Sequence, residues 1–155
     1  MISQIIFRYF DRKSAAIKVL RDYKSMEKII KNTKGKILDE QMKMYSLGSF
    51  AMDGMPHAHN LHSREDRITN SIDKIDFLKD RYEAAREYMS WVNPAWHSLT
   101  EEEQYLLSQF YFDEDARRDN LITDIADRMC ICTQSVYNKK NKALEKFTML
   151  LFGVK

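Results

Sequence analysis

The stretch from Thr133 to Lys142 holds the side chains best suited to chemistry with a polar, charged ligand. Gln134 and Asn138 each offer a paired donor and acceptor, the pattern that binds adenine edges, whereas lysine suits guanine or phosphate. Ser135, Lys139 and Lys142 are better matched to phosphate oxygens. The candidate DNA-contacting residues are Thr133, Gln134, Ser135, Tyr137, Asn138, Lys139, Asn141 and Lys142.

Three consecutive helices within residues 97–155 are expected to position these side chains. Thr100 and Glu103 have the spacing of a capping box, which starts the first helix. Residues 122–129 form the second helix, and a three-residue break separates it from the third, which begins at Thr133. Ala126 is small enough to let the third helix approach closely. The pattern predicts a helix-turn-helix, whose last helix enters the major groove with its N-terminus first.

Apolar residues recur at helical spacing on one side of each of these helices. The first helix is expected to bury Tyr105, Leu106, Phe110 and Tyr111, and the second to bury Leu121, Ile122, Ile125, Ala126 and Met129. The inward side of the third is expected to comprise Val136, the stem of Lys140, Ala143, Leu144, Phe147, Leu150 and Leu151. A polar connection over residues 112–120 joins the first helix to the second.

Residues 1–96 predict an antiparallel helical hairpin, so the fold class is all-α with a boundary near residue 96. Residues 14–46 have a helical period, within which 32–35 is a candidate interruption, and the Gly- and Pro-containing stretch 47–63 predicts the loop. Ser63 is expected to begin the second helix, which runs to about Trp91 and is ended by Asn93-Pro94. Trp91 and Trp96 at this junction are expected to pack the two parts of the chain together.

The net charge of +2 is distributed unevenly along the chain. Residues 1–47 carry eleven Lys or Arg against five Asp or Glu, whereas residues 48–96 and 97–155 each have a net charge of −2. Residues 133–155 contain five Lys and one Glu, which makes the third helix locally basic. Phosphates respond to this local charge rather than to the total, so the distribution is compatible with nucleic-acid binding.

Other functional classes find little support in the sequence. It contains no nucleophile elbow, phosphate loop or dinucleotide fingerprint, so we expect neither an enzyme nor a cofactor. Cys130 and Cys132 are two reduced thiols in this interpretation, and His57, His59 and His62 are solvated loop residues rather than metal ligands. No signal peptide or membrane span is evident, which predicts a cytoplasmic protein.

Several short segments resemble known transcription factors. They are Leu99–Glu103, Ile125-Ala126, Ser135–Tyr137 and Lys142–Leu144, together with the Gly54–Pro56 loop and the Trp91–Leu99 junction. The last third is similar to the helix-turn-helix of sigma factors that reads the −35 promoter element. The full layout resembles the small phage and mobile-element regulators of the RinA/ArpU late-gene activator type. This resemblance implies a nucleoid-associated protein of a bacterial host that binds promoter DNA, activates late operons and contacts RNA polymerase.

Two interpretations from different classes therefore stay open. In the first, the chain is a sequence-specific DNA-binding regulator, and the N-terminal hairpin mediates homodimerisation or polymerase contact. In the second, it is a helical adaptor that binds host RNA polymerase or another host protein without reading DNA. The acidic first helix at Glu101–Glu103 and the near-neutral total charge motivate the second.

Overall fold

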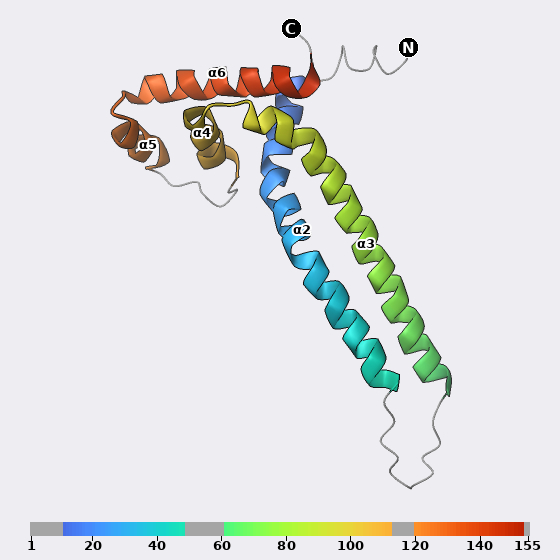
Figure 1. The fold of residues 1–155 in the computed structure, drawn as a ribbon. Coiled ribbons are helices and arrows are strands. Elements are labelled where there is room, and N and C mark those ends of the chain that lie inside the picture. Colours follow the sequence, from blue (N-terminus) through green and yellow to red (C-terminus); the bar gives the residue numbers. More distant parts are fainter. Residues whose placement is uncertain (1–10, 49–60, 113–119, 154–155) are drawn as a thin grey trace. The chain divides into compact units, whose positions relative to one another are not determined.

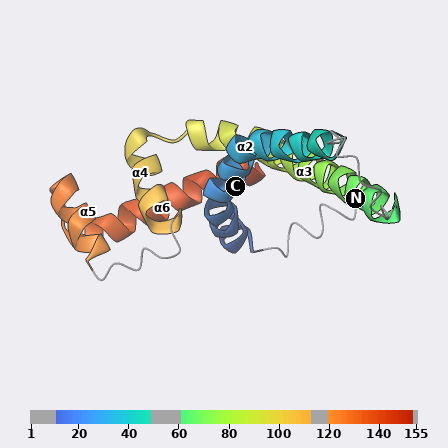
Figure 2. The ribbon, with the colours of Figure 1, turned by 90° about the horizontal axis from the view of Figure 1, so that it is seen from below.

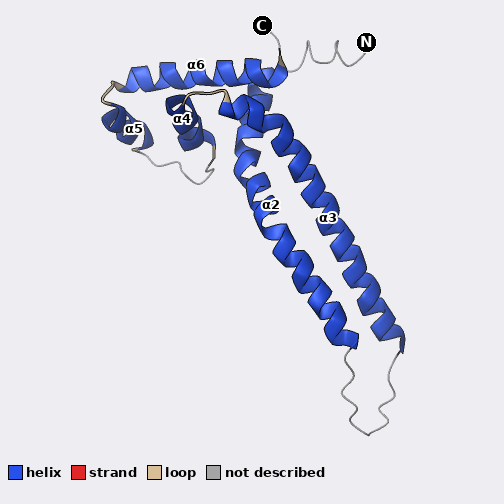
Figure 3. Cartoon of the chain, in the orientation of Figure 1, coloured by secondary structure: helices blue, strands red, loops and turns tan. Residues whose placement is uncertain are grey.

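All the elements that the computed structural model describes are helices, which confirms the predicted all-α class (Figure 1; Figure 3). The structure describes residues 11–48, 61–112 and 120–153. The helices are α2 (Arg12–Gly48), α3 (Leu61–His97), α4 (Glu101–Tyr111), α5 (Leu121–Met129) and α6 (Thr133–Phe152). None of these described helices is both long enough and apolar enough to cross a membrane.

The chain divides into two compact units. Unit 1 comprises Met1–Met26 and Tyr88–Lys155, and unit 2 comprises Glu27–Glu87. Unit 1 therefore contains the start of α2 and the end of α3 in addition to α4, α5 and α6. The domain boundary near residue 96 stays a prediction about which part of the chain folds by itself.

Unit 1 has two apolar cores, and α6 contributes to both. The larger core joins the start of α2, the end of α3, α4 and the second half of α6; its fully buried side chains include Leu20, Val92, Leu107 and Phe147. The smaller core joins α4, α5 and the front of α6 through Leu106, Ile125, Ala126 and Val136. Figure 2 shows α6 running past both α4 and α5. Because one helix crosses both cores, the position of its exposed front is fixed by packing along its whole length.

The end of α3 is held in unit 1 by aromatic packing and hydrogen bonds. Trp96 is 8% exposed and lies against Tyr23, Phe112 and Phe147 with ring centroids 5.5, 5.1 and 6.3 Å away. The Tyr23 hydroxyl donates to Asn93 Oδ1 at 3.0 Å. The packing role predicted for Trp96 is confirmed. Trp91 is 48% exposed, and its ring lies edge-on to Phe152 of α6 with 6.1 Å between the centroids.

Helix α3 does not end at Asn93-Pro94 as predicted but continues through Pro94 to His97. Val92, Ala95 and Trp96 are buried in the larger core on both sides of the proline. The energy of packing these residues outweighs the local preference against α conformation before proline. The Pro94 carbonyl also accepts from the backbone N–H and the hydroxyl of Ser98.

Unit 2 consists of residues 27–48 of α2 and 61–87 of α3, which lie side by side and antiparallel (Figure 1; Figure 2). Its buried apolar side chains are Ile75 and Ala85 only, within the residues that the structure describes. Thr33 and Ser71 are also buried. In a cleft that Lys74 and Phe77 of α3 also line, the Lys43 ammonium donates to Glu40 at 2.7 Å and lowers the pKa of that carboxyl. The unit therefore has little interior of its own.

Three further expectations about α2 and α3 are wrong in detail. Residues 32–35 do not interrupt α2, because Thr33 turns inward and its hydroxyl donates to the Ile29 carbonyl at 2.6 Å. Helix α2 extends to Gly48 and α3 begins at Leu61 rather than Ser63, so residues 47–48 and 61–63 of the expected loop are helical. Residues 49–60, with His57 and His59, and the acidic stretch 113–115 lie outside the described part of the chain, as does the side chain of His62.

Candidate nucleic-acid interface

The turn before α6 is built as a helix-ending motif of α5. The backbone N–H of Ile131 donates to the Ala126 carbonyl at 3.0 Å, and that of Cys130 donates to the Asp127 carbonyl at 3.3 Å. These two bonds define a Schellman motif, which requires a left-handed residue after the helix. Cys130 takes that conformation with φ 52° and ψ 43°. Ile131 then packs on the smaller core, which fixes the direction in which the chain enters α6.

Helix α6 begins at Thr133, as predicted, with Cys132 as its N-cap residue. The Cys132 thiol lies 3.1 Å from the Ser135 hydroxyl. This contact, together with nearby backbone N–H groups, lowers the pKa of the Cys132 thiol. Ser135 is consequently engaged at its own helix terminus, and a phosphate there would share its hydroxyl with the thiol.

The outward side of the first turns of α6 is exposed and polar. Thr133, Gln134, Asn138, Asn141 and Lys142 are all exposed. Among the residues that the structure describes, none makes a hydrogen bond or ion pair with the side chains of Gln134, Asn138, Asn141 or Lys142. An uncommitted donor–acceptor row on a rigid helix can bind an external partner without first breaking contacts within the protein.

Tyr137 has a partly structural role. It is 40% exposed, and its ring centroid lies 6.5 Å from that of Phe110 in α4. The Lys140 ammonium lies over both rings, 5.3 Å from the centroid of Phe110 and 5.7 Å from that of Tyr137. Partial burial lowers the pKa of Lys140. The expectation that the stem of Lys140 faces inward is consistent with this placement.

Two lysines of α6 are ion-paired to the first turn of α4. Lys139 contacts Glu102, and Lys146 contacts Glu103 with 2.7 Å between Nζ and Oε2. Glu103 also completes the predicted capping box, since it accepts from the Thr100 N–H at 2.9 Å while its own N–H donates to Thr100 Oγ1 at 3.3 Å. Burial raises the pKa of Glu103, but the bonds from Lys146 and Thr100 outweigh it and keep that pKa below its ordinary value.

These ion pairs were not predicted from the sequence. The partners are 37 and 43 residues apart, and nothing in either local pattern links them. Their consequence is that Lys139, a candidate phosphate ligand, has a carboxylate beside it, whereas Lys142 has none of the described residues as a partner. A phosphate at Lys139 would compete with Glu102.

The inward side of α6 follows the prediction with one exception. Val136, Ala143, Leu144, Phe147 and Leu151 are buried, whereas Leu150 is 43% exposed. Leu150 and Leu151 were both expected on the inward side, but only Leu151 belongs to the larger core. In α4, Leu106 is buried as expected, and Leu107 is a core residue that the sequence pattern missed.

Arg128 is a further cation near this face that was not selected from the sequence. Its guanidinium lies 4.6 Å from the centroid of the Tyr105 ring, and Nη1 is 3.5 Å from the Tyr105 hydroxyl. Its place in the last turn of α5, just before the turn into α6, is the signal that could have identified it.

Comparison of the chain with protein-family models, with curated proteins and with solved structures gave no match.

Proposed function

We propose that this protein is a sequence-specific DNA-binding transcription regulator whose α6 contacts the major groove. The observation that carries the proposal is the uncommitted polar row of Gln134, Asn138, Asn141 and Lys142 at the front of α6. The buried side of the same helix is anchored on α4 and α5, and the entry turn contains three residues. This combination of a rigid helix and an exposed polar front is typical of recognition helices.

The proposal assigns different roles to the exposed side chains. Gln134 and Asn138 pair with base edges, because each amide presents one donor and one acceptor in a plane. Lys142 contacts phosphate, and Arg128 supports it from α5. Lys139 contributes less than its charge suggests, because binding must replace its contact with Glu102. In a phage or mobile-element setting, such a protein would activate promoters beside RNA polymerase.

Selection of random double-stranded DNA on the purified chain tests this proposal. One enriched motif is expected, with affinity that falls as salt rises. Asn138→Ala with Lys142→Ala should weaken binding to that motif by roughly tenfold or more and reduce the salt slope by about one for the lost phosphate contact. The matched control is Asn70→Ala with Lys74→Ala, the same pair of residues at the same spacing on the exposed side of α3.

Unchanged affinity in the α6 double variant, or an equal loss in the α3 control, would overturn the assignment of α6. A selection without any enriched motif would favour the adaptor hypothesis instead. That hypothesis draws on the acidic first turn of α4, where Glu101 and Glu102 are exposed. Its test is capture of purified RNA polymerase by the wild-type chain but not by a Glu101→Lys, Glu102→Lys variant.

A further inference from the structure

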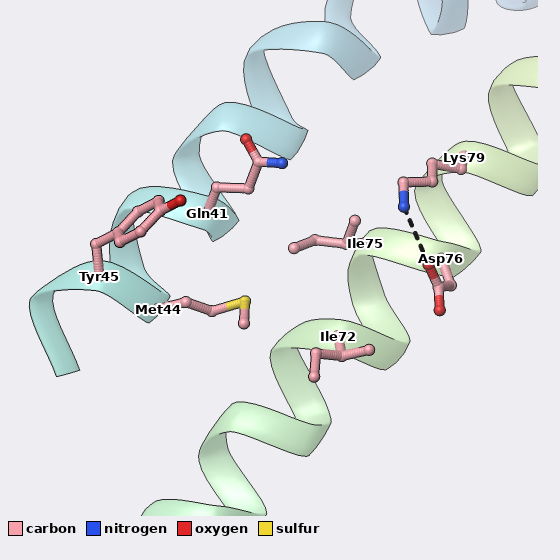
Figure 4. A pocket seen from close by; sticks show the side chains of 7 residues that line it. All are labelled: Gln41, Met44, Tyr45, Ile72, Ile75, Asp76 and Lys79. Carbon is pink, nitrogen blue, oxygen red and sulfur yellow. Dashed lines mark hydrogen bonds and ion pairs between the residues drawn. The ribbon is translucent and has the colours of Figure 1, made fainter. Parts of the chain in front are cut away.

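Unit 2 has an apolar face that its own two helices leave uncovered. The face comprises Leu38, Met42 and Tyr45 of α2 and Ile72 of α3, which are 59%, 70%, 81% and 44% exposed. Leu38, Met42 and Tyr45 follow one another at helical spacing, so they form a single stripe. Tyr45 and Ile72 also line a cleft of about 430 Å³ between the two helices, together with Gln41, Met44, Ile75, Asp76 and Lys79 (Figure 4). Leu38 and Met42 continue the apolar stripe of α2 outside this lining.

Two helices cannot bury such a face by themselves. Unit 2 buries only Ile75 and Ala85 among its described apolar residues, far fewer than unit 1. Amphipathic helix pairs of this kind commonly complete their core as a four-helix bundle. A covering surface with two more helical faces of matching length would complete such a bundle.

The charges on the two helices show which surface fits. Residues 27–48 of α2 carry five Lys against three Asp or Glu, whereas residues 61–87 of α3 carry six Lys or Arg against seven Asp or Glu. The first helix segment is thus net positive and the second net negative. A second copy placed by a two-fold axis along the helices lays each α2 on the partner's α3, and opposite charges meet twice. Laying α2 on the partner's α2 would oppose like charges.

The same pairing matches the residues that continue each stripe. On α2 the stripe runs from Tyr45 back through Leu38 to Lys34 and Lys31, and on α3 it runs from Ile72 through Asp76 to Glu83 and Glu87. Tyr45 and Ile72 line the same cleft and the helices are antiparallel, so the lysines lie at the level of the two glutamates. In the two-fold pair, apolar side chains meet near the cleft and lysines meet glutamates beyond it. Lys31 and Glu83 already have exposed partners on their own helices, Glu27 at 3.0 Å and Arg86 at 3.5 Å, and the contacts between copies would share these groups.

We propose that unit 2 is a dimerisation element in which this apolar face binds the same face of a second copy, α2 against the partner's α3. The proposal rests on unit 2 alone and is independent of DNA binding by α6.

Sedimentation equilibrium of the full chain over about 1 to 100 µM tests it. A dimer is expected, and Tyr45→Glu or Ile72→Glu should raise its dissociation constant by about tenfold or more. Phe77→Glu is the matched control. Phe77 is 65% exposed, like the residues of the apolar face, but it lines a separate cleft with Leu78 and Lys36. It is five residues after Ile72, which places it about 140° around α3 from that residue. A monomer throughout this range, or a dimer that Tyr45→Glu leaves unchanged, would overturn the proposal, and so would equal weakening by Phe77→Glu.

A charge exchange tests the pairing of α2 with the partner's α3. Lys31→Glu with Lys34→Glu opposes glutamate to glutamate, and Glu83→Lys with Glu87→Lys opposes lysine to lysine, so each variant alone should dimerise more weakly. Mixing the two variants restores both attractive contacts and should recover a heterodimer of near wild-type affinity. Circular dichroism of each variant checks that the helices are intact. Folded variants that do not recover on mixing would rule out this arrangement.

Discussion

At the scale of single residues, the least favourable backbone position lies next to the proposed recognition helix. Cys130 occupies the left-handed region that the turn between α5 and α6 requires. A side chain with a Cβ atom costs about 1 kcal/mol or more in this conformation, and glycine avoids that cost. The turn therefore keeps its geometry because two backbone hydrogen bonds and the burial of Ile131 enforce it.

We expect Cys130→Gly to raise the free energy of unfolding by about 0.5 to 1 kcal/mol, the relieved strain less the entropy that glycine adds to the unfolded chain. Urea unfolding followed by circular dichroism measures the change. Cys130→Ala is the paired control, because alanine also removes the thiol but keeps the Cβ atom that the left-handed conformation disfavours. If both substitutions change the free energy of unfolding equally, the left-handed conformation at residue 130 does not destabilise the protein as its φ angle indicates.

At the scale of elements, α2 remains helical across Gly35 although glycine is a poor helix former. The neighbouring Thr33 is buried and bonded to the Ile29 carbonyl, which ties this stretch to the inner side of unit 2. A Cβ atom added at Gly35 would meet nothing within 4 Å. The residue thus has no steric reason in unit 2 to be glycine.

Gly35→Ala should stabilise α2, raising the free energy of unfolding by up to about 1 kcal/mol through the helix propensity of alanine. Urea titrations at one fixed protein concentration provide the comparison, because self-association would otherwise contribute. Gly153→Ala is the opposite case: that residue ends α6 with φ 67°, and alanine there should destabilise. Loss of stability in Gly35→Ala would indicate that residue 35 is covered by a partner.

At the scale of the whole molecule, the two proposals concern separate units and can be tested for coupling. A single helix-turn-helix covers little DNA, so two copies joined through unit 2 would gain affinity on a site with two half-sites. This gain in affinity arises because the two copies are linked, which raises the effective concentration of the second α6 at its half-site. It requires no additional contact between either α6 and DNA.

The coupling predicts that Tyr45→Glu weakens binding to a two-half-site DNA by about tenfold or more and leaves binding to one half-site unchanged. Fluorescence anisotropy with both DNAs, at a protein concentration where the wild-type chain is dimeric, makes the comparison. Asn138→Ala should weaken binding to both. Equal losses on the two DNAs in Tyr45→Glu would mean that unit 2 contributes to DNA binding without joining two copies.

Local signals were sufficient for the elements of the last third of the chain. The Thr100–Glu103 capping box and the three-residue break before Thr133 appear as predicted, because caps and turns depend on residues a few positions apart. The apolar period likewise identified the core residues of α6, apart from Leu150. The exposed polar row of α6 follows from the same period, since its residues are those that the core does not use.

Tertiary structure decided what depends on residues far apart in the sequence. Helix α3 continues through Pro94 because Ala95 and Trp96 are buried against α2 and α6. The free energy of this burial depends on distant residues, so local helix preferences do not include it. Tertiary structure also paired Lys139 and Lys146 with Glu102 and Glu103, and left Lys142 as the uncommitted cation of the row. The sequence by itself determined the all-α class, the end of α5 at Met129, the start of α6 at Thr133 and the residue types at the α6 front. Packing decided which of those side chains are available to a partner, because availability depends on what each one touches in space.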